Sequence, residues 1–115
     1  MGRGGVVRKQ DYTETKIRER SMVFTKRLRE PIMRGEITCS VRIWRSPRAK
    51  VGGRYRLGAG AIEVTGFHQI SLADITPDLA RRSGFAGVVD LLKIAKHGAG
   101  EKVYLVEFDY HPDAA

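Results

Sequence analysis

Hydrophobic and polar positions alternate with a period of two in several short segments of the chain, which indicates strands. The clearest are residues 61–70 and 102–110, and in the first of them Gly66 is a candidate β-bulge. Shorter apolar stretches predict further strands at residues 22–24 and 37–44 and around Tyr55 and Leu57. Glycines and Pro47 separate these segments, as expected for turns.

Helix signals occur in two places. Residues 25–34 begin with a possible cap at Thr25 and end before Gly35, although Pro31 requires the helix to be short or kinked. Between the two long strands, Thr76 or Asp74 is a possible cap for a helix that ends at Gly84, and a second, apolar helix covers residues 86–95. The order is strand, helix, three strands, two helices, strand. This predicts an α+β fold, a barrel or half-barrel with flanking helices.

The octapeptide at residues 35–42 reads Gly-Glu-Ile-Thr-Cys-Ser-Val-Arg and combines two kinds of side chain. Alternation puts Thr38, Ser40 and Arg42 on one face of the strand, and Cys39 with other apolar residues on the opposite face. The apolar face suits a hydrophobic core. The face with two hydroxyls and a guanidinium suits a polar cleft.

Charge is distributed unevenly along the 115 residues. Positions 1–56 hold 16 Lys or Arg against 5 acids, a balance of +11, whereas positions 57–115 hold 5 against 8, a balance of −3. The net charge of +8 and this polarity are typical of a face that binds a polyanion, and a basic surface without a dedicated partner is the alternative. The chain contains one cysteine, so no intramolecular disulfide is possible, and no His/Cys cluster suggests a metal.

No segment has the length or composition of a membrane span or a signal peptide, which favours a cytoplasmic protein. The pattern divides the chain into a basic, mobile arm at residues 1–21, one domain at residues 22–110 and a tail at residues 111–115. The oligomeric state is not indicated.

Cations and one tryptophan gather after the octapeptide. Arginine pairs with phosphate through two hydrogen bonds, and tryptophan stacks on bases, so their interleaving favours single-stranded RNA or structured loops. For Trp44 alone, a place in the hydrophobic core is an equal alternative. The candidate RNA-binding residues on the strand and helix are Lys26, Arg27, Arg34, Thr38, Ser40, Arg42, Trp44, Arg45, Arg48, Lys50, Arg54 and Arg56.

The octapeptide also resembles a degenerate form of the G-x-K-x-x-E-x-R signature of ASCH domains. The resemblance extends over about residues 22–110, including the helix that ends at Gly35, the turn at residues 50–55, and the closing strand. It implies a small PUA-like β-barrel of about five strands with flanking helices, and a function in RNA binding without cofactors.

The sequence departs from that signature at its lysine, here Ile37, and at its acid, here Ser40. A glutamate expected near Ser83 is also absent. The mechanism of the family's acetylcytidine amidohydrolases therefore does not transfer to these residues. An RNA-directed enzyme, either a metal-independent ribonuclease or a modified-nucleoside amidohydrolase, remains the alternative, with Ser40, Lys50 and Tyr55 as candidate catalytic residues. A protein-interaction module is the third possibility.

Overall fold

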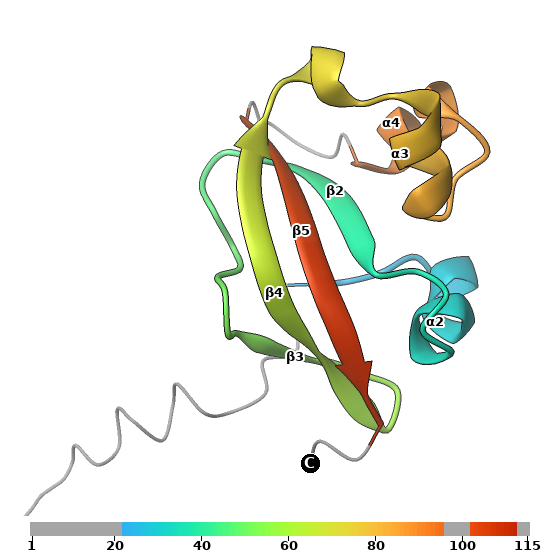
Figure 1. Ribbon diagram of the computed structural model, residues 1–115, viewed down its shortest axis with the longest axis vertical. Coiled ribbons are helices and arrows are strands. Elements are labelled where there is room, and N and C mark those ends of the chain that lie inside the picture. Colours follow the sequence, from blue (N-terminus) through green and yellow to red (C-terminus); the bar gives the residue numbers. More distant parts are fainter. Residues whose placement is uncertain (1–21, 96–101, 113–115) are drawn as a thin grey trace, which may run out of the picture.

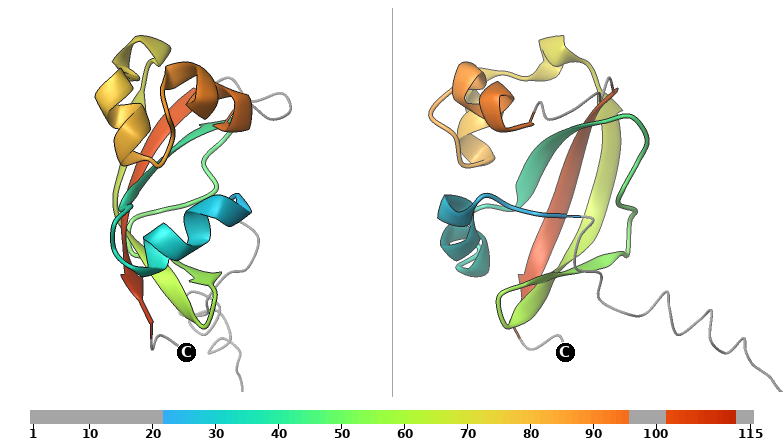
Figure 2. Two further views of the ribbon diagram at one scale, coloured as in Figure 1. Left: turned by 90° about the vertical axis from the view of Figure 1, so that its right-hand side faces the viewer. Right: turned by 180° about the vertical axis from the view of Figure 1, so that it is seen from behind.

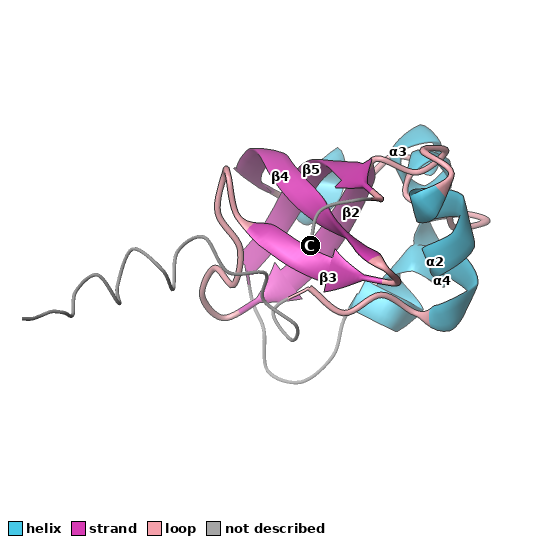
Figure 3. Ribbon diagram, turned by 90° about the horizontal axis from the view of Figure 1, so that it is seen from below, coloured by secondary structure: helices cyan, strands magenta, loops and turns pink. Residues whose placement is uncertain are grey.

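Four antiparallel strands form one curled sheet, a half-barrel (Figure 1, Figure 3). The computed structural model describes residues 22–95 and 102–112. The spatial order of the strands is β2-β5-β4-β3, so β2 and β3 are the edges of the sheet. The strands are β2 (Cys39–Trp44), β3 (Arg54–Leu57), β4 (Gly60–Ile70) and β5 (Lys102–His111).

The three α-helices, α2, α3 and α4, lie on the β2 side of the sheet (Figure 2). Short α3 and α4 occupy one end of this side, and α2 lies below them in the view of Figure 1. No helix in the described part of the chain is long and apolar enough to cross a membrane. The helices are α2 (Lys26–Met33), the 3-10 helix η1 (Leu72–Asp74), α3 (Pro77–Arg82) and α4 (Val88–Ala95).

Glycines in the left-handed region end α2 and α3, as the sequence predicts. Gly35 has φ +78°, and its N–H donates to the Ile32 carbonyl at 2.9 Å, while the next N–H donates to the Pro31 carbonyl. This pair of bonds is a Schellman motif, which satisfies the carbonyls left over at the helix end. Gly84, with φ +97°, ends α3 in the same way.

Of the predicted caps, Thr76 acts as one and Thr25 does not use its side chain. Thr76 Oγ1 accepts a hydrogen bond of 3.1 Å from the Leu79 N–H at the start of α3, with Pro77 in the first position. Thr25 precedes α2, but its hydroxyl makes no capping bond there. The predicted bulge is confirmed, because the register between β4 and β5 shifts between Val64 and Gly66.

The expected strand at residues 22–24 is not formed, and the prediction of a five-stranded barrel is wrong. Met22 and Phe24 are buried and Val23 is exposed, so the alternation is real. It arises from packing, since the Phe24 ring meets Phe108 edge-on at 5.6 Å, while the Phe24 carbonyl accepts from the Arg29 side chain. Residues 22–24 form no backbone ladder with either edge strand, so the sheet stays open and does not close into a barrel.

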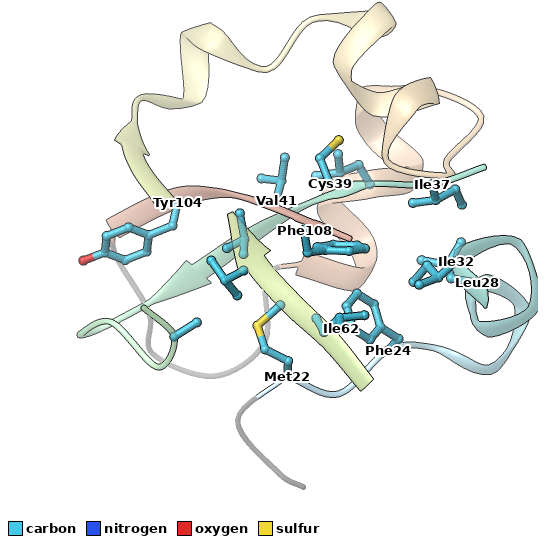
Figure 4. Packing of buried hydrophobic residues seen from close by; sticks show 14 of the residues in the cluster. Met22, Phe24, Leu28, Ile32, Ile37, Cys39, Val41, Ile62, Tyr104 and Phe108 are labelled. Carbon is cyan, nitrogen blue, oxygen red and sulfur yellow. The ribbon is translucent and has the colours of Figure 1, made fainter. Parts of the chain in front are cut away.

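The sequence predicted one apolar face of β2 toward the core and one polar face toward a cleft, but residues on both faces of this strand are buried. Cys39 pairs in register with Glu107, and Ser40 with Val106, so successive residues point to opposite faces. Cys39 and Val41 point toward α3, whereas Phe24 and Phe108 lie together on the other side (Figure 4). Arg42 is in register with Tyr104 and therefore shares the face that carries the aromatic part of the core.

The basic arm at residues 1–21, the glycines at 98 and 100 and most of the tail at 111–115 lie outside the described residues. The predicted boundaries of the arm and tail therefore stay predictions.

Candidate anion-binding pocket

A pocket of about 780 Å³ lies beside the free edge of β2. Three parts of the chain form it: the segment entering α2, the edge strand with the residues that follow it, and the α3–α4 region. Because the strand order leaves β2 without a second neighbour in the described chain, the pocket occupies the place where another strand would pair. The lining residues are Val23, Phe24, Thr25, Leu28, Ser40, Val41, Arg42, Ile43, Trp44, Arg45, Ser46, Arg48, Phe85, Ile94 and Ala95.

Arg42 is the partly buried cation of this pocket. Its Nε donates a hydrogen bond of 2.8 Å to Ser40 Oγ, and its guanidinium carbon lies 4.7 Å from the centre of the Phe24 ring, a cation–π contact. Burial lowers the pKa of Arg42 to about 10, because the charged form is less well solvated than in water. The side chain is still protonated at neutral pH.

No acidic residue lines the pocket, whereas three arginines do. In the described chain, the ion pairs of arginine lie elsewhere: Arg34 with Glu30 and Glu36, Arg27 with Asp90, and Arg81 with Asp78. A cation that is partly removed from water is stabilised by a nearby counter-charge. Arg42 lacks one within the described residues, and a bound anion would supply it.

Arg45 and Arg48 form the rim of the pocket. Both follow the buried part of β2 and both are exposed, with Ser46 between them. Exposed arginines attract an anion over the distance of a Debye length and hold it by fork-shaped contacts. In the pocket, the expected cluster of cations therefore consists of one partly buried arginine and two exposed ones.

Trp44 lines the pocket, but most of its surface is buried against other residues. It is 9% exposed, and its ring stacks on Phe67 at 6.4 Å between centroids and lies against Tyr104 at 5.8 Å. Arg42 and Trp44 do share a face of the strand, as predicted. The packing favours the hydrophobic-core alternative for Trp44, because both neighbouring rings occupy surface that a base would need.

Several predicted site residues lie away from this pocket. Thr38 precedes β2, and Lys50, Arg54 and Arg56 lie on the turn and strand that follow the rim. None of the four lines the pocket, although Arg56 borders a smaller hollow of about 150 Å³ with Arg29.

The three candidate catalytic residues are not assembled in the pocket. Ser40 lines it, but Lys50 is exposed outside it, and Tyr55 is 3% exposed on β3 at the opposite edge of the sheet. The Ser40 hydroxyl is bonded to Arg42 instead of to a lysine. A serine without a general base is a poor nucleophile.

The predicted basic residues of α2 are partly neutralised. Arg27 pairs with Asp90 at 3.1 Å and lies over the Phe85 ring, and Arg34 pairs with Glu36 at 2.9 Å. The pKa of the Asp90 carboxyl is lowered chiefly by a hydrogen bond from the Ala86 N–H and then by Arg27. The pKa of the Glu36 carboxyl is lowered chiefly by its hydrogen bond from Arg34. Lys26 is exposed on the same helix.

The apolar walls of the pocket were not anticipated from the sequence. Phe24, Leu28 and Phe85 carry ordinary core patterns, and only the tertiary arrangement brings them beside Arg42. The described residues contain no group of three or more His, Cys, Asp or Glu side chains arranged to hold a metal ion.

Comparison of the chain with models of protein families, with curated proteins and with solved structures gives no significant match. The pocket has to be interpreted from its own geometry and charge.

Proposed function

We propose that this protein binds single-stranded RNA, or a single-stranded loop, through the arginine pocket, meaning the pocket that Arg42, Arg45 and Arg48 line. The observation that carries the proposal is a partly buried arginine, Arg42, beside two exposed arginines in a pocket whose lining contains no acidic side chain. Phosphate is the group that such a set of arginines recognises best, because each guanidinium offers parallel N–H donors.

The form of the pocket supports RNA over a double-stranded nucleic acid. Much of its lining is apolar and its central cation, Arg42, is partly buried, so a flexible, unpaired segment reaches that cation more easily than a rigid duplex does. Single-stranded loops and ends can do this, since their bases and phosphates are free to turn out of a helix. The resemblance of residues 35–42 to the ASCH signature is a second, independent support.

Binding is favoured over the enzymatic alternative by what surrounds Ser40. Its hydroxyl accepts from Arg42, and the pocket lining contains no lysine, histidine or carboxylate that would remove its proton. Recognition needs the cations that are present, whereas hydrolysis would need a base that the lining lacks.

The test is fluorescence anisotropy with a labelled single-stranded RNA of about 12 nucleotides at several salt concentrations. The affinity should fall steeply with salt, because each neutralised phosphate releases counterions. The double variant R45A/R48A should reduce the slope of log K against log salt by about 1.4, the value for two lost contacts on a single strand.

R81A/R82A is the matched control, because it removes two exposed arginines from α3, outside the pocket lining. It should keep most of the affinity. Binding that does not change between low and physiological salt would contradict the proposal. An equal loss in both double variants would place the RNA elsewhere.

A further inference from the structure

We infer that the arginine pocket recognises the terminal phosphate of an RNA strand, with Arg42 as the residue that contacts it. This inference rests on the proposed function and adds to it the part of the RNA that enters the pocket. Two observations carry it: the donors that Arg42 leaves unused, and the position of the exposed cations at one end of the pocket.

The first observation concerns the guanidinium of Arg42. Its Nε is used by Ser40, and Phe24 covers one face of the group. The described structure gives the two terminal nitrogens of Arg42 no hydrogen-bond partner, and the residue lines the pocket. Ser40 and Phe24 thus hold the side chain in place. The two terminal nitrogens keep the parallel N–H donors that suit two phosphate oxygens.

The second observation is the asymmetry of charge around the pocket. Arg45 and Arg48 mark one end, where β2 finishes. At the other side the walls are Leu28 and Phe85, and the cation nearest that wall, Arg27, is paired with Asp90. Among the lining residues, the exposed cations, Arg45 and Arg48, lie only at the first end, so an RNA backbone is attracted along that path.

A phosphate inside a continuous strand has a nucleotide on each side, so the strand would have to enter and leave the pocket. A terminal phosphate has only one neighbour and needs only one path. The charge distribution supplies one path, over Arg45 and Arg48, and this is why an end fits better than the middle of a strand.

Charge favours the same ligand. A phosphate monoester carries about −1.5 to −2 charges at pH 7, whereas each internal phosphodiester carries one. The lining holds no acid that would oppose the second charge. A partly buried cation without a counter-charge is stabilised more by the ligand with the greater negative charge.

The experiment compares labelled RNA strands of one sequence that differ only at their ends: a 5′-phosphate, a 3′-phosphate, or hydroxyls at both ends. One of the phosphorylated strands should bind at least about tenfold more tightly than the hydroxyl strand, the gain expected for one charge-assisted contact. Which of the two it is identifies the end. Equal binding of all three strands would overturn the inference and leave the proposed function intact, whereas no binding of any strand would overturn both.

Variants of Arg42 connect the preference to the pocket. R42M should bind all three strands alike, at the level of the hydroxyl strand, because the rim remains. R42K retains a charge without the fork and should keep a reduced preference, and it serves as the test if R42M does not fold. R82A is the control and should keep the full preference. A preference that persists unchanged in R42M and R42K would place the terminal phosphate elsewhere.

A nucleoside monophosphate and inorganic phosphate are the remaining probes, used as competitors. They should compete only at concentrations far above the dissociation constant of the phosphorylated strand, because they lack the backbone that contacts the rim. A mononucleotide that binds as tightly as the phosphorylated strand would show that the pocket serves a free nucleotide, and it would contradict the RNA-end inference.

Discussion

Arg42 Nε donates a hydrogen bond of 2.8 Å to Ser40 Oγ, and the two residues lie two positions apart on one face of the edge strand β2. The bond joins the best candidate for a nucleophile to the best candidate for an anion-binding group. It orients the guanidinium by its Nε and leaves the hydroxyl without a base. The pair therefore fits recognition better than hydrolysis.

The first prediction is that the purified protein does not deacetylate acetylcytidine. General acid–base catalysis supplies about 10²–10⁴-fold, and the pocket lining contains no residue to provide it. I37K should not create activity, since Ile37 is 8% exposed and a lysine there would be buried beside Leu28 and Gly84. Chromatography of the products over hours with enzyme in excess is the measurement. Turnover by the unmodified protein that S40A abolishes would show that the binding interpretation is wrong.

The second prediction separates function from stability at Arg42. Replacing a partly desolvated charge by an apolar side chain of similar volume removes the cost of desolvating that charge. Burial lowers the pKa of Arg42 to about 10, so at every pH below that value the protonated side chain destabilises the folded state relative to the unfolded chain. The melting temperature of R42M should equal or exceed that of the unmodified protein, while the affinity for RNA falls.

Differential scanning calorimetry at pH 7 without ligand checks this. A clear drop in the melting temperature would mean that the bond to Ser40 and the contact with Phe24 outweigh the cost of burial. Arg42 would then be a structural residue.

The third prediction concerns Trp44, for which the sequence left two roles open. The ring is 9% exposed and packs against Phe67 and Tyr104, so W44A should lower the free energy of unfolding by about 3–5 kcal/mol. Urea denaturation is the measurement. The neighbouring exposed variant R45A should change the stability by less than about 0.5 kcal/mol. A folded, stable W44A protein that no longer binds RNA would favour stacking on a base.

The fourth prediction is the pH dependence contributed by Asp90. The pKa of its carboxyl is lowered first by the Ala86 N–H, which donates at 2.9 Å, and then by Arg27. A carboxyl with a lowered pKa in the folded state binds fewer protons there than when unfolded. Its contribution to stability is therefore present above the unfolded pKa of about 4 and is lost as the pH falls through the lower folded value.

D90N should consequently lose less stability than the unmodified protein between pH 6 and pH 3, as measured by urea midpoints. D109N is the comparison, because Asp109 is an exposed acid on β5, away from the Ala86–Asp90 hydrogen bond at the start of α4. If D90N and the unmodified protein lose stability in parallel, the bonds to Asp90 do not contribute to acid sensitivity.

Local signals in the sequence predicted the elements well where a backbone requirement, such as a positive φ or an N-cap, selects the residue type. Gly35 and Gly84 end helices because only glycine adopts their positive φ easily, and Thr76 caps because its hydroxyl reaches an N–H three residues ahead. The strand alternation in residues 61–70 and the bulge near Gly66 were equally readable.

The pocket was less predictable, because alternation tells which residues share a face and not what covers that face. Ser40 and Arg42 do lie on one face, yet that face also bears the aromatic core and is closed by Phe24. Residues 22–24 alternate like a strand, but no edge strand pairs with them. Lys50 and Tyr55 are near Ser40 in the sequence and are kept out of the pocket by the order of the strands.

The absence of a side chain at Gly84 limits how the pocket can diversify. A Cβ at this position would lie 2.6 Å from Leu28 Cδ2 and 2.7 Å from Ile37 Cδ1, besides adopting a strained φ. Leu28 and the adjacent Phe85 both form the wall of the pocket. Any side chain at position 84 would therefore push that wall from behind. Homologues that accept a ligand of another size are expected to vary at positions 28 and 85 while retaining glycine at position 84.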